Sequence, residues 1–349
     1  MTKQILAVLL LCFPALLMGA PRCITVKAGD AESLLQAIDE ANRVNADSLS
    51  ARLYILVPNG VYDLGSRVLT TLTGHNVAIV GESMRGTVIV NRPPKEGEGI
   101  GKTATLRLMT SDTYLQDLTL QNALDYYAAG SAGRAVALHD KGTRTICNRV
   151  CLLSYQDTYY TDNVESQSYL VNSEIHGTVD FICGAGDAYF DHCTLVTERR
   201  NRDGSGRNVI AAPRTADTPW GYVFESCVVW NRQSDFFLAR GWHTTPRCTW
   251  LNTRLMTPER LLPTRFDPQS IRAVDCCFGE YATVDAEGRL LTPPTNVIAF
   301  EAKGQRQEAE TVLTPKEVRR YVLKKIFPDW RPEKIVERTI KEIDLLREA

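Results

Sequence analysis

The chain has 349 residues, of which 44% are hydrophobic and 23% are charged, and its formal net charge at pH 7 is -1. These values are typical of a soluble globular protein with one large domain or two smaller ones. The near-neutral charge argues against a nucleic-acid-binding protein, which would carry a strong basic excess. An anionic ligand held in a local basic cleft stays possible.

The N-terminal segment, residues 1–20, has the layout of a secretory signal peptide. Lys3 precedes an apolar run over residues 5–18, and small residues follow, with a cleavage site expected near Ala20. The apolar run is short for a membrane span. We therefore expect no stable membrane span and a mature protein that is secreted or periplasmic. An uncleaved anchor or a lipoprotein attached at Cys23 are the alternatives.

The mature chain opens with one predicted helix followed by strands. The stretch "AESLLQAIDEANRV", residues 31–44, has apolar residues at helical spacing and predicts a short amphipathic helix. The next stretch, "ARLYILVPNGVYDLG", predicts a strand, a Pro-Asn-Gly turn and a second short strand.

From there to about residue 255, short strand-like segments recur without a long helical pattern. Six of them share one form, in which an apolar group, a polar residue and a second apolar group follow one another: "YLQDLTL", "TICNRVCL", "YLVNSEI", "YFDHCTL", "YVFESCVV" and "TWLNTRL". Their spacing is irregular, at roughly 20 to 35 residues, which is the range of solenoid repeats. The pattern predicts an all-β parallel β-helix in which each coil stacks on the previous one. An antiparallel β-sandwich is the alternative.

The C-terminal segment changes to a helical pattern. The stretch "LTPKEVRRYVLKKIF" begins with Thr314, Pro315 and Glu317, which is the layout of a capping box with proline at the first helical position. The stretch "RPEKIVERTIKEIDLL" predicts a second helix. We expect a helical segment over about residues 314–349, packed along or over the end of a single domain that spans residues 21–349.

The cysteines and histidines do not indicate a metal site by their spacing. Of ten cysteines, Cys12 lies in the signal peptide, and the remaining nine cannot all pair within the chain. Most lie in apolar strand patterns, namely Cys147, Cys151, Cys193 and Cys227. A free thiol in such a strand behaves as a small hydrophobe. Disulfide bridges between neighbouring strands are the alternative. The five histidines are scattered, and we interpret them as structural or surface residues. His243 is the one that could contact a substrate.

Two aspartates and one arginine are the candidate catalytic residues. Asp157 in "YQDTYY" and Asp180 in "GTVDFICGAGDAYF" are about one solenoid coil apart, so their carboxylates can lie on adjacent strands, roughly 5 Å apart. Two such carboxylates do not ionise equally, and one becomes an acid while the other stays charged. In "LARGW", Arg240 and Trp242 face the same side of a strand. The guanidinium could hold one carboxylate ionised, and the indole could cover a sugar ring.

These segments resemble the pectinesterase (pectin methylesterase) family, in its bacterial secreted type. The family signatures run close to QAV, QDTLY, DFIFG and LGRPW, and they appear here in the same order as "GRAVAL", "YQDTYY", "VDFICG" and "LARGW". The openings "ITVKAGDAESLLQAIDEA" and "VPNGVYDL" are also similar to that family. The resemblance covers most of the mature chain and implies a right-handed parallel β-helix.

The resemblance also implies roles for individual residues. Asp180 matches the family nucleophile, Asp157 the general acid/base and Gln156 an oxyanion donor. Arg240 matches the residue bonded to the nucleophile, and Trp242 a substrate-contacting aromatic. The implied reaction removes methyl esters from the galacturonate units of pectin, with release of methanol and pectate.

Three further residues are assigned to substrate binding: Arg134, Tyr160 and Phe181. The implied chemistry uses no cofactor and no metal. The expected partner is a methyl-esterified galacturonan, and the expected state is a monomer.

The sequence departs from the family pattern at several positions. Arg134 stands where the family has a second oxyanion glutamine, and it brings a permanent charge. Gly241 replaces a proline before Trp242, Cys183 replaces an aromatic, and the glutamate expected after "GVY" is absent. These changes affect the expected substrate preference and rate.

Two other functions compete with an esterase. A β-helix polysaccharide lyase would need an acidic calcium-binding cluster and a basic proton abstractor, whereas this sequence offers a Gln-Asp pair. A non-catalytic polysaccharide-binding protein would not need both aspartates together with Arg240. The sequence therefore favours the esterase.

Overall fold

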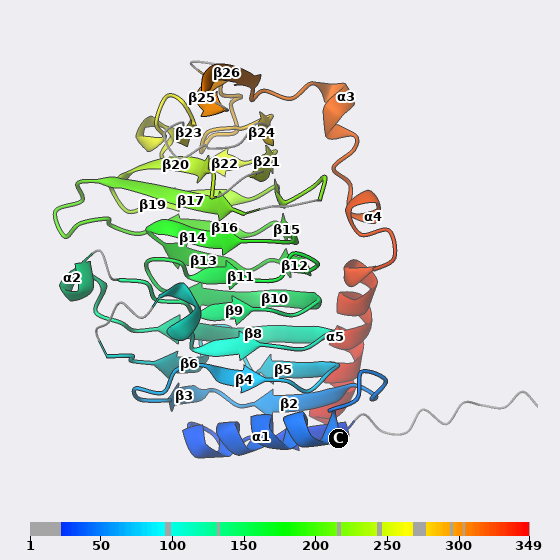
Figure 1. Ribbon diagram of the computed structural model, residues 1–349. Coiled ribbons are helices and arrows are strands. Elements are labelled where there is room, and N and C mark those ends of the chain that lie inside the picture. The colour runs from blue at the N-terminus through cyan, green and yellow to red at the C-terminus, as the bar shows by residue number, and fades with distance from the viewer. Residues whose placement is uncertain are drawn as a thin grey trace, which may run out of the picture.

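The computed structural model describes residues 22–348 apart from 95–98, 131–132, 215–217, 243–245, 268–276, 294–295 and 303. The expected signal peptide and His243 lie outside the described residues. Figure 1 shows the strands stacked as successive coils of one solenoid, with β2 near one end and β24 near the other. The predicted all-β parallel β-helix is confirmed, and the antiparallel sandwich is excluded because the strands of both large sheets pair in parallel.

Two parallel sheets form the walls of the solenoid. The first follows one path of hydrogen-bonded strands: β1 (Arg22–Thr25), β2 (Leu53–Val57), β5 (Val77–Gly81), β8 (Thr113–Asn122), β10 (Arg144–Leu153), β12 (Gln167–Val171), β15 (Asp187–Asp191), β18 (Tyr222–Glu225), β21 (Arg247–Leu251) and β24 (Cys277–Tyr281). Its side branch contains β3 (Gly60–Asp63), β6 (Thr87–Asn91), β13 (Glu174–Gly177), β16 (Thr194–Thr197), β19 (Val228–Asn231) and β22 (Arg254–Leu255). The second sheet contains β4 (Thr70–Leu72), β7 (Leu106–Leu108), β9 (Leu138–Asp140), β11 (Tyr159–Thr161), β14 (Val179–Gly184), β17 (Arg207–Pro213), β20 (Asp235–Arg240) and β23 (Phe266–Asp267).

The six similar sequence segments form one corner of the solenoid. In each, the polar residue between the two apolar groups has a left-handed backbone, with φ between 50° and 54°: Asp117, Arg149, Asn172, His192, Ser226 and Asn252. A left-handed residue turns the chain, so the strand on one side joins the main path and the strand on the other joins the side branch. The repeat in the sequence is therefore the repeat of this turn.

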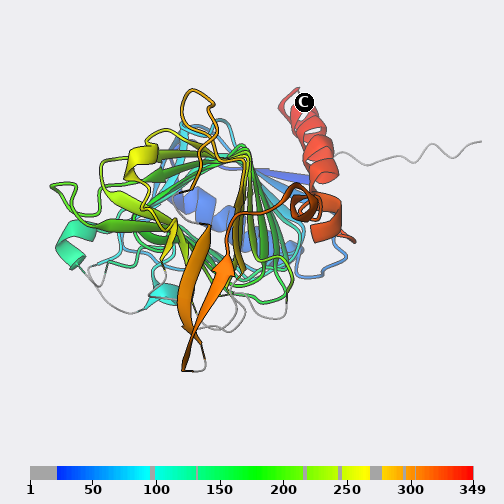
Figure 2. The ribbon, with the colours of Figure 1, turned by 90° about the horizontal axis from the view of Figure 1, so that it is seen from above.

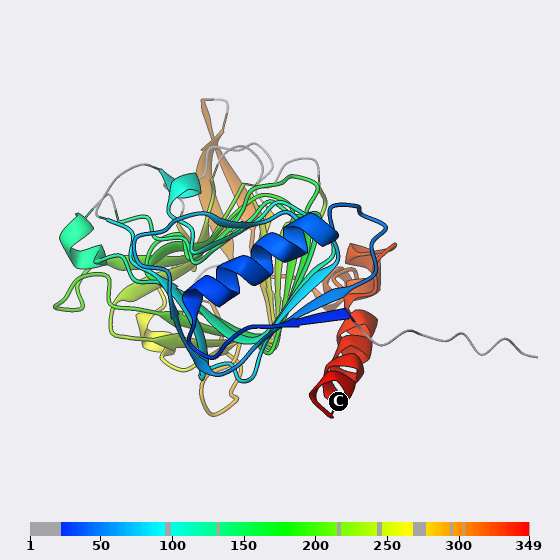
Figure 3. The same cartoon turned by 90° about the horizontal axis from the view of Figure 1, so that it is seen from below.

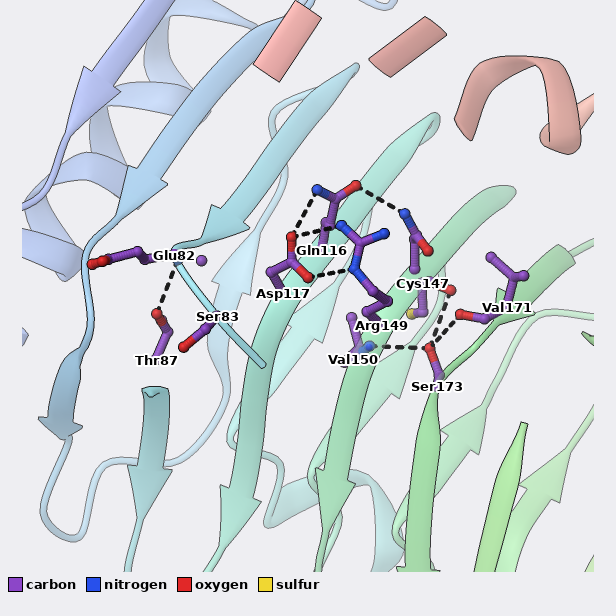
Figure 4. Close-up of polar contacts among 12 residues, drawn as sticks. Glu82, Ser83, Thr87, Gln116, Asp117, Cys147, Arg149, Val150, Val171 and Ser173 are labelled. Atoms are coloured by element: carbon purple, nitrogen blue, oxygen red, sulfur yellow. Dashed lines mark hydrogen bonds and ion pairs between the residues drawn. The ribbon is translucent and has the colours of Figure 1, made fainter. Parts of the chain in front are cut away.

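Polar side chains join neighbouring coils at this corner (Figure 4). The Arg149 guanidinium donates to both oxygens of Asp117 on the preceding coil, at 2.6 and 2.8 Å. Gln116 Nε2 also donates to Asp117, at 2.9 Å, and the Val150 backbone N–H donates to the Ser173 hydroxyl on the next coil at 3.1 Å. The bidentate pair orients two strands relative to each other as well as binding them.

Apolar side chains of successive coils stack inside the solenoid. Strand pairing places Phe190 opposite Phe224 and Phe224 opposite Trp250. Their rings are stacked with centroids 4.4 and 3.9 Å apart. Such buried aromatics supply much of the hydrophobic stabilisation of a core. Cys147, Cys193 and Cys227 lie in the same core as free thiols, which is one of the two states that the sequence left open.

The predicted N-terminal helix is present as α1 (Ala31–Val44) and lies across one end of the solenoid (Figure 3). Asp30 caps it by accepting a hydrogen bond from the Ser33 backbone N–H at 3.0 Å. Its buried residues, which include Leu34 and Ile38, continue the interior core. The helix therefore closes the end of the stack, where the first coil would otherwise expose its core.

The C-terminal region differs in part from the prediction. The stretch predicted as one helix over residues 313–327 is divided into α3 (Pro315–Val318) and α4 (Leu323–Ile326), although the capping box at Thr314 is present. An antiparallel hairpin of β25 (Val297–Ala302) and β26 (Gln305–Glu310) precedes them. Among the described residues, the remaining helical elements are α2 (Tyr126–Ala129), α5 (Pro332–Glu348) and two 3₁₀ turns, Ile100–Lys102 and Pro258–Arg260.

The helices α3 to α5 lie beside the solenoid (Figure 2), and α5 runs along the outside of the main sheet. Ile343 of α5 and Phe327 belong to one buried apolar cluster with outward-facing residues of the sheet such as Tyr114. Arg52 donates to the Thr339 hydroxyl at 2.9 Å. The C-terminal helix thus covers an apolar outer face of the sheet. Among the described residues, no helix combines the length and apolar character needed to cross a bilayer.

Candidate active site

Strand register brings the two predicted aspartates together. The pairing of β11 with β14 sets Tyr159 opposite Ile182, so Asp157 and Asp180 occupy equivalent positions on successive coils. The Asp157 backbone N–H donates to the Val179 carbonyl at 3.2 Å. Both aspartates have a left-handed backbone, with φ of 59° and 52°. Aspartate accepts this conformation more readily than most residues, so each turn is compatible with a carboxyl side chain.

Arg240 holds Asp180 through a bidentate pair. It lies at the end of β20, and β17 separates that strand from β14. Its Nε donates to Asp180 Oδ1 at 2.7 Å, and its Nη2 donates to the other oxygen. Two charge-assisted hydrogen bonds fix both the orientation and the charge of the carboxylate. The contact expected between Arg240 and Asp180 is therefore present in the structure.

The two aspartates and Arg240 face one cavity of about 190 Å³. Its wall is formed by Ile100, Arg134, Gln156, Asp157, Asp180, Cys183, Arg240 and Trp242. Arg134 and Gln156 are backbone bridge partners on adjacent coils, and both line the cavity. The charge of Arg134 also acts on the Asp157 carboxyl, so Arg134 belongs to the site.

Burial and neighbouring charges give the Asp157 and Asp180 carboxyls different protonation states. Burial and the neighbouring charge of Asp180 raise the pKa of Asp157 to about 8, although Arg134 and Arg240 oppose that rise. Burial also raises the pKa of Asp180, and the charge and hydrogen bonds of Arg240 oppose it. Because the guanidinium is bonded directly to Asp180, we assign the negative charge to Asp180 and the proton to Asp157 at neutral pH.

Two of the predicted substrate-binding residues are not in the cavity wall. Phe181 is fully buried in the interior core, so its assignment to substrate binding is wrong: the residue after Asp180 points into the solenoid. Tyr160 is only 5% exposed. Its ring stacks on His139 and lies 6.0 Å from that of Trp242, centroid to centroid. Tyr160 therefore supports the indole and does not line the cavity.

Cys183 and Ile100 complete the cavity wall and were not predicted as site residues. The Cys183 thiol lies 3.9 Å from Asp157 Oδ1. Burial and the charge of Asp157 raise the pKa of this thiol well above its usual range, so it stays neutral. The sequence showed Cys183 only as a departure from an aromatic. No local signal identified Ile100, which comes from a distant 3₁₀ turn.

A second, larger cavity of about 470 Å³ adjoins the first through Arg240. Two more arginines, Arg200 and Arg207, line it together with Asp267. The Arg200 guanidinium donates to the Tyr126 hydroxyl at 2.5 Å, and its charge acts on Asp180. A groove with this charge suits an anionic polymer.

Comparison with known proteins identifies the family. A family model described as Pectinesterase matches residues 24–259. The chain belongs to the pectinesterase family. Pectinesterase A of Dickeya chrysanthemi is 29% identical over 322 residues, covering 82% of this chain and 86% of the relative. A probable pectinesterase/pectinesterase inhibitor of Arabidopsis thaliana is 26% identical over 295 residues, and the match spans 82% of this chain but 50% of the plant protein.

Solved structures agree with this pectinesterase assignment. The pectin methylesterase PemA from Erwinia chrysanthemi has a TM-score of 0.70 at 24% identity, covering 90% of this chain and 98% of that one. A pectin methylesterase in complex with a hexasaccharide has a TM-score of 0.67 at 25% identity, covering 84% and 93%. The parallel β-helix of this pectinesterase is thus shared over nearly its whole described length.

Proposed function

We propose that this pectinesterase hydrolyses methyl esters of galacturonate units in a pectic polysaccharide, with Asp180 as nucleophile and Asp157 as general acid/base. One observation carries the proposal: an arginine-paired carboxylate and a carboxyl with a pKa of about 8 share a single cavity. Such a pair supplies a nucleophile and a proton donor at the same pH. The family relationship and the oligosaccharide bound to a related pectin methylesterase support the substrate class.

In the first half of the reaction, the Asp180 carboxylate attacks the ester carbonyl of the substrate and forms an acyl-enzyme anhydride. The negative charge that develops on the carbonyl oxygen is stabilised by the Gln156 amide and the Arg134 guanidinium. Asp157 gives its proton to the departing methanol. Arg240 keeps the nucleophile ionised and aimed before the substrate arrives.

In the second half, Asp157 has become a carboxylate and takes a proton from a water molecule. That water attacks the substrate-derived carbonyl of the anhydride, which frees Asp180 and leaves the galacturonate carboxylic acid. Asp157 is then protonated again for the next cycle. We propose that Trp242 covers a sugar ring during both steps, a role supported by its place in the cavity wall and its contact with Tyr160.

The decisive experiment measures methanol release from methyl-esterified galacturonan by the Asp180→Asn variant. We expect turnover to fall to background with an unchanged fold, because the amide cannot act as the nucleophile. Asp203→Asn is the matched control, since Asp203 is exposed on a loop, and it should keep full activity. Near-normal methanol release by Asp180→Asn would contradict the mechanism. Cleavage of the polymer with formation of unsaturated ends in place of methanol would favour the lyase.

We further propose that the mature protein, residues 21–349, is exported as one domain and acts as a monomer. The charge and apolar pattern of residues 1–20 support export. N-terminal sequencing of the protein recovered outside the cytoplasm should begin near residue 21. An intact first residue in that fraction would contradict cleavage, and a larger species in light scattering would contradict the monomer.

A further inference from the structure

A second cluster of reactive side chains lies outside the candidate active site, on the side branch of the first sheet. The pairing of β10 with β13 places Cys151 opposite Glu174. Glu174 and His176 are two residues apart on β13 and therefore face the same side of the strand. One ligand atom from each of these three residues lies within 4.8 Å of the others. The cavity of Asp157 and Asp180 belongs to the other sheet.

The histidine of this cluster is held as metal-binding histidines usually are. His176 Nε2 is hydrogen-bonded to Glu174 Oε1, a contact that an entering ion would replace, while Nδ1 lies 2.7 Å from Glu198 Oε1. A ligating imidazole commonly donates its other ring N–H to a carboxylate, which fixes the tautomer and the ring orientation. Glu198 comes from the segment that follows β16, so residues from three successive coils build this arrangement.

We propose that Cys151, Glu174 and His176 form a zinc site, with Glu198 orienting the imidazole. Thiolate sulfur, imidazole nitrogen and carboxylate oxygen together are the donor set of Zn²⁺, whereas Ca²⁺ and Mg²⁺ prefer oxygen alone. The Cys151 and His176 side chains are buried, and the paired strands hold the three ligands near one another. Three protein ligands leave a fourth position for water.

Arg85 lies beside these ligands and competes with a metal ion for them. Its Nη2 lies 2.5 Å from Glu174 Oε2, and its Nη1 lies 3.5 Å from Cys151 Sγ. The arginine side chain is 60% exposed, so it can turn to solvent when an ion enters. Removal of this cation should therefore strengthen metal binding.

The bound ion would link neighbouring coils, so it would stabilise the folded chain. It joins β10 to β13 directly and, through Glu198, to the coil of β16. Binding to the folded chain alone raises the midpoint of thermal unfolding. Asp180→Asn, which removes the proposed nucleophile on the other sheet, should bind the metal normally, so this inference and the esterase function can fail independently.

The test uses the full mature chain, stripped of metal with a chelator and then titrated with Co²⁺ and Zn²⁺. We expect one Co²⁺ per chain with a near-ultraviolet thiolate-to-cobalt charge-transfer band, displacement of that band by Zn²⁺, and a higher unfolding midpoint with Zn²⁺. Cys151→Ser should abolish the band. Glu198→Gln should weaken affinity by about 10- to 100-fold, and Arg85→Gln should strengthen it.

Matched controls separate this site from other histidines and thiols. His192 also bonds a carboxylate through Nδ1, at 2.6 Å from Asp191 Oδ1, and Cys23 is an exposed thiol. His192→Gln and Cys23→Ser should bind Co²⁺ as the parent chain does, whereas His176→Gln should not. The absence of a thiolate band in the parent chain would overturn the proposal, and this readout needs no variant to fold. Unchanged binding in Cys151→Ser would also overturn it.

Discussion

Replacing Arg134 with glutamine tests how the site sets the proton affinity of its acid. Arg134 lines the same cavity as Gln156 and Asp157. Its charge favours the ionised form of Asp157 and opposes the rise of that pKa to about 8. Asp157 must be protonated to release methanol, so activity should fall as the pH rises through its pKa. Removal of the cation should move this alkaline limb to higher pH.

The size of the shift follows from the geometry. Arg134 and Gln156 are backbone partners on adjacent coils, and we take roughly 7 Å, about one and a half inter-strand spacings, as the separation of the charge from the Asp157 carboxyl. At an effective dielectric constant of about 20, a unit charge at that distance contributes about 2.4 kcal/mol. Arg134 is partly exposed, and solvent screens part of its charge. We expect about 1.4 kcal/mol to survive, which corresponds to about one pH unit.

The assay is methanol release by kcat over a pH series, on one defined methyl-esterified oligogalacturonide. Arg134→Lys is the matched control, since it keeps the charge and should keep the position of the alkaline limb. Arg134→Gln should also weaken the preference for substrates with a free carboxylate on a neighbouring sugar, because the guanidinium fork suits that group. An alkaline limb that does not move in Arg134→Gln, or that moves equally in Arg134→Lys, would refute the reasoning.

Three further substitutions test neighbouring parts of the site. Asp157→Asn should lower methanol release by about 10²- to 10⁴-fold. The same variant should have a higher unfolding midpoint than the parent, and the difference should grow from about pH 4 to about pH 8. The Asp157 carboxyl of the folded parent keeps its proton to about pH 8, whereas in the unfolded parent it loses the proton near pH 4, so the parent loses stability over this range. A constant difference across that range would contradict the raised pKa. Arg240→Ala removes the partner of Asp180, so the pKa of Asp180 should rise further and the acidic limb of the rate profile should move upward; an unmoved limb would mean that the pair does not control the nucleophile. Trp242→Ala should mainly raise KM for oligogalacturonides, and an unchanged KM would argue against a sugar platform.

Much of the fold was predictable because every coil of the solenoid repeats the same local turn. Each coil turns at a left-handed residue such as Asn172 or Asn252, and a polar residue between two apolar groups records that turn in the sequence. Helix α1 was predicted with its observed ends because its amphipathic pattern and its Asp30 cap are local. The break between α3 and α4 and the hairpin of β25 and β26 were not predicted, since packing against distant strands decides them.

The sequence predicted only those site residues whose side chains the proposed reaction itself requires. Asp157 and Asp180 meet in the structure as their spacing predicted, and Arg240 contacts Asp180 as the family resemblance implied. Phe181 was misassigned because motif membership does not tell which side of the strand a residue faces. The proposed zinc ligands gave no signal in the sequence, because Cys151 and Glu174 lie on different coils and only the register of β10 with β13 brings them together.

The two aspartates use the same backbone device as the structural corner. Asp117 and Arg149 turn the chain with left-handed backbones on successive coils, and Asp157 and Asp180 do the same on the other sheet. Their carboxyls are therefore placed by coil stacking, which is more rigid than a surface loop. Asparagine accepts a left-handed backbone about as readily as aspartate, whereas alanine does not. Asn variants thus remove the charge at each position and leave the turn intact, so their losses report on chemistry.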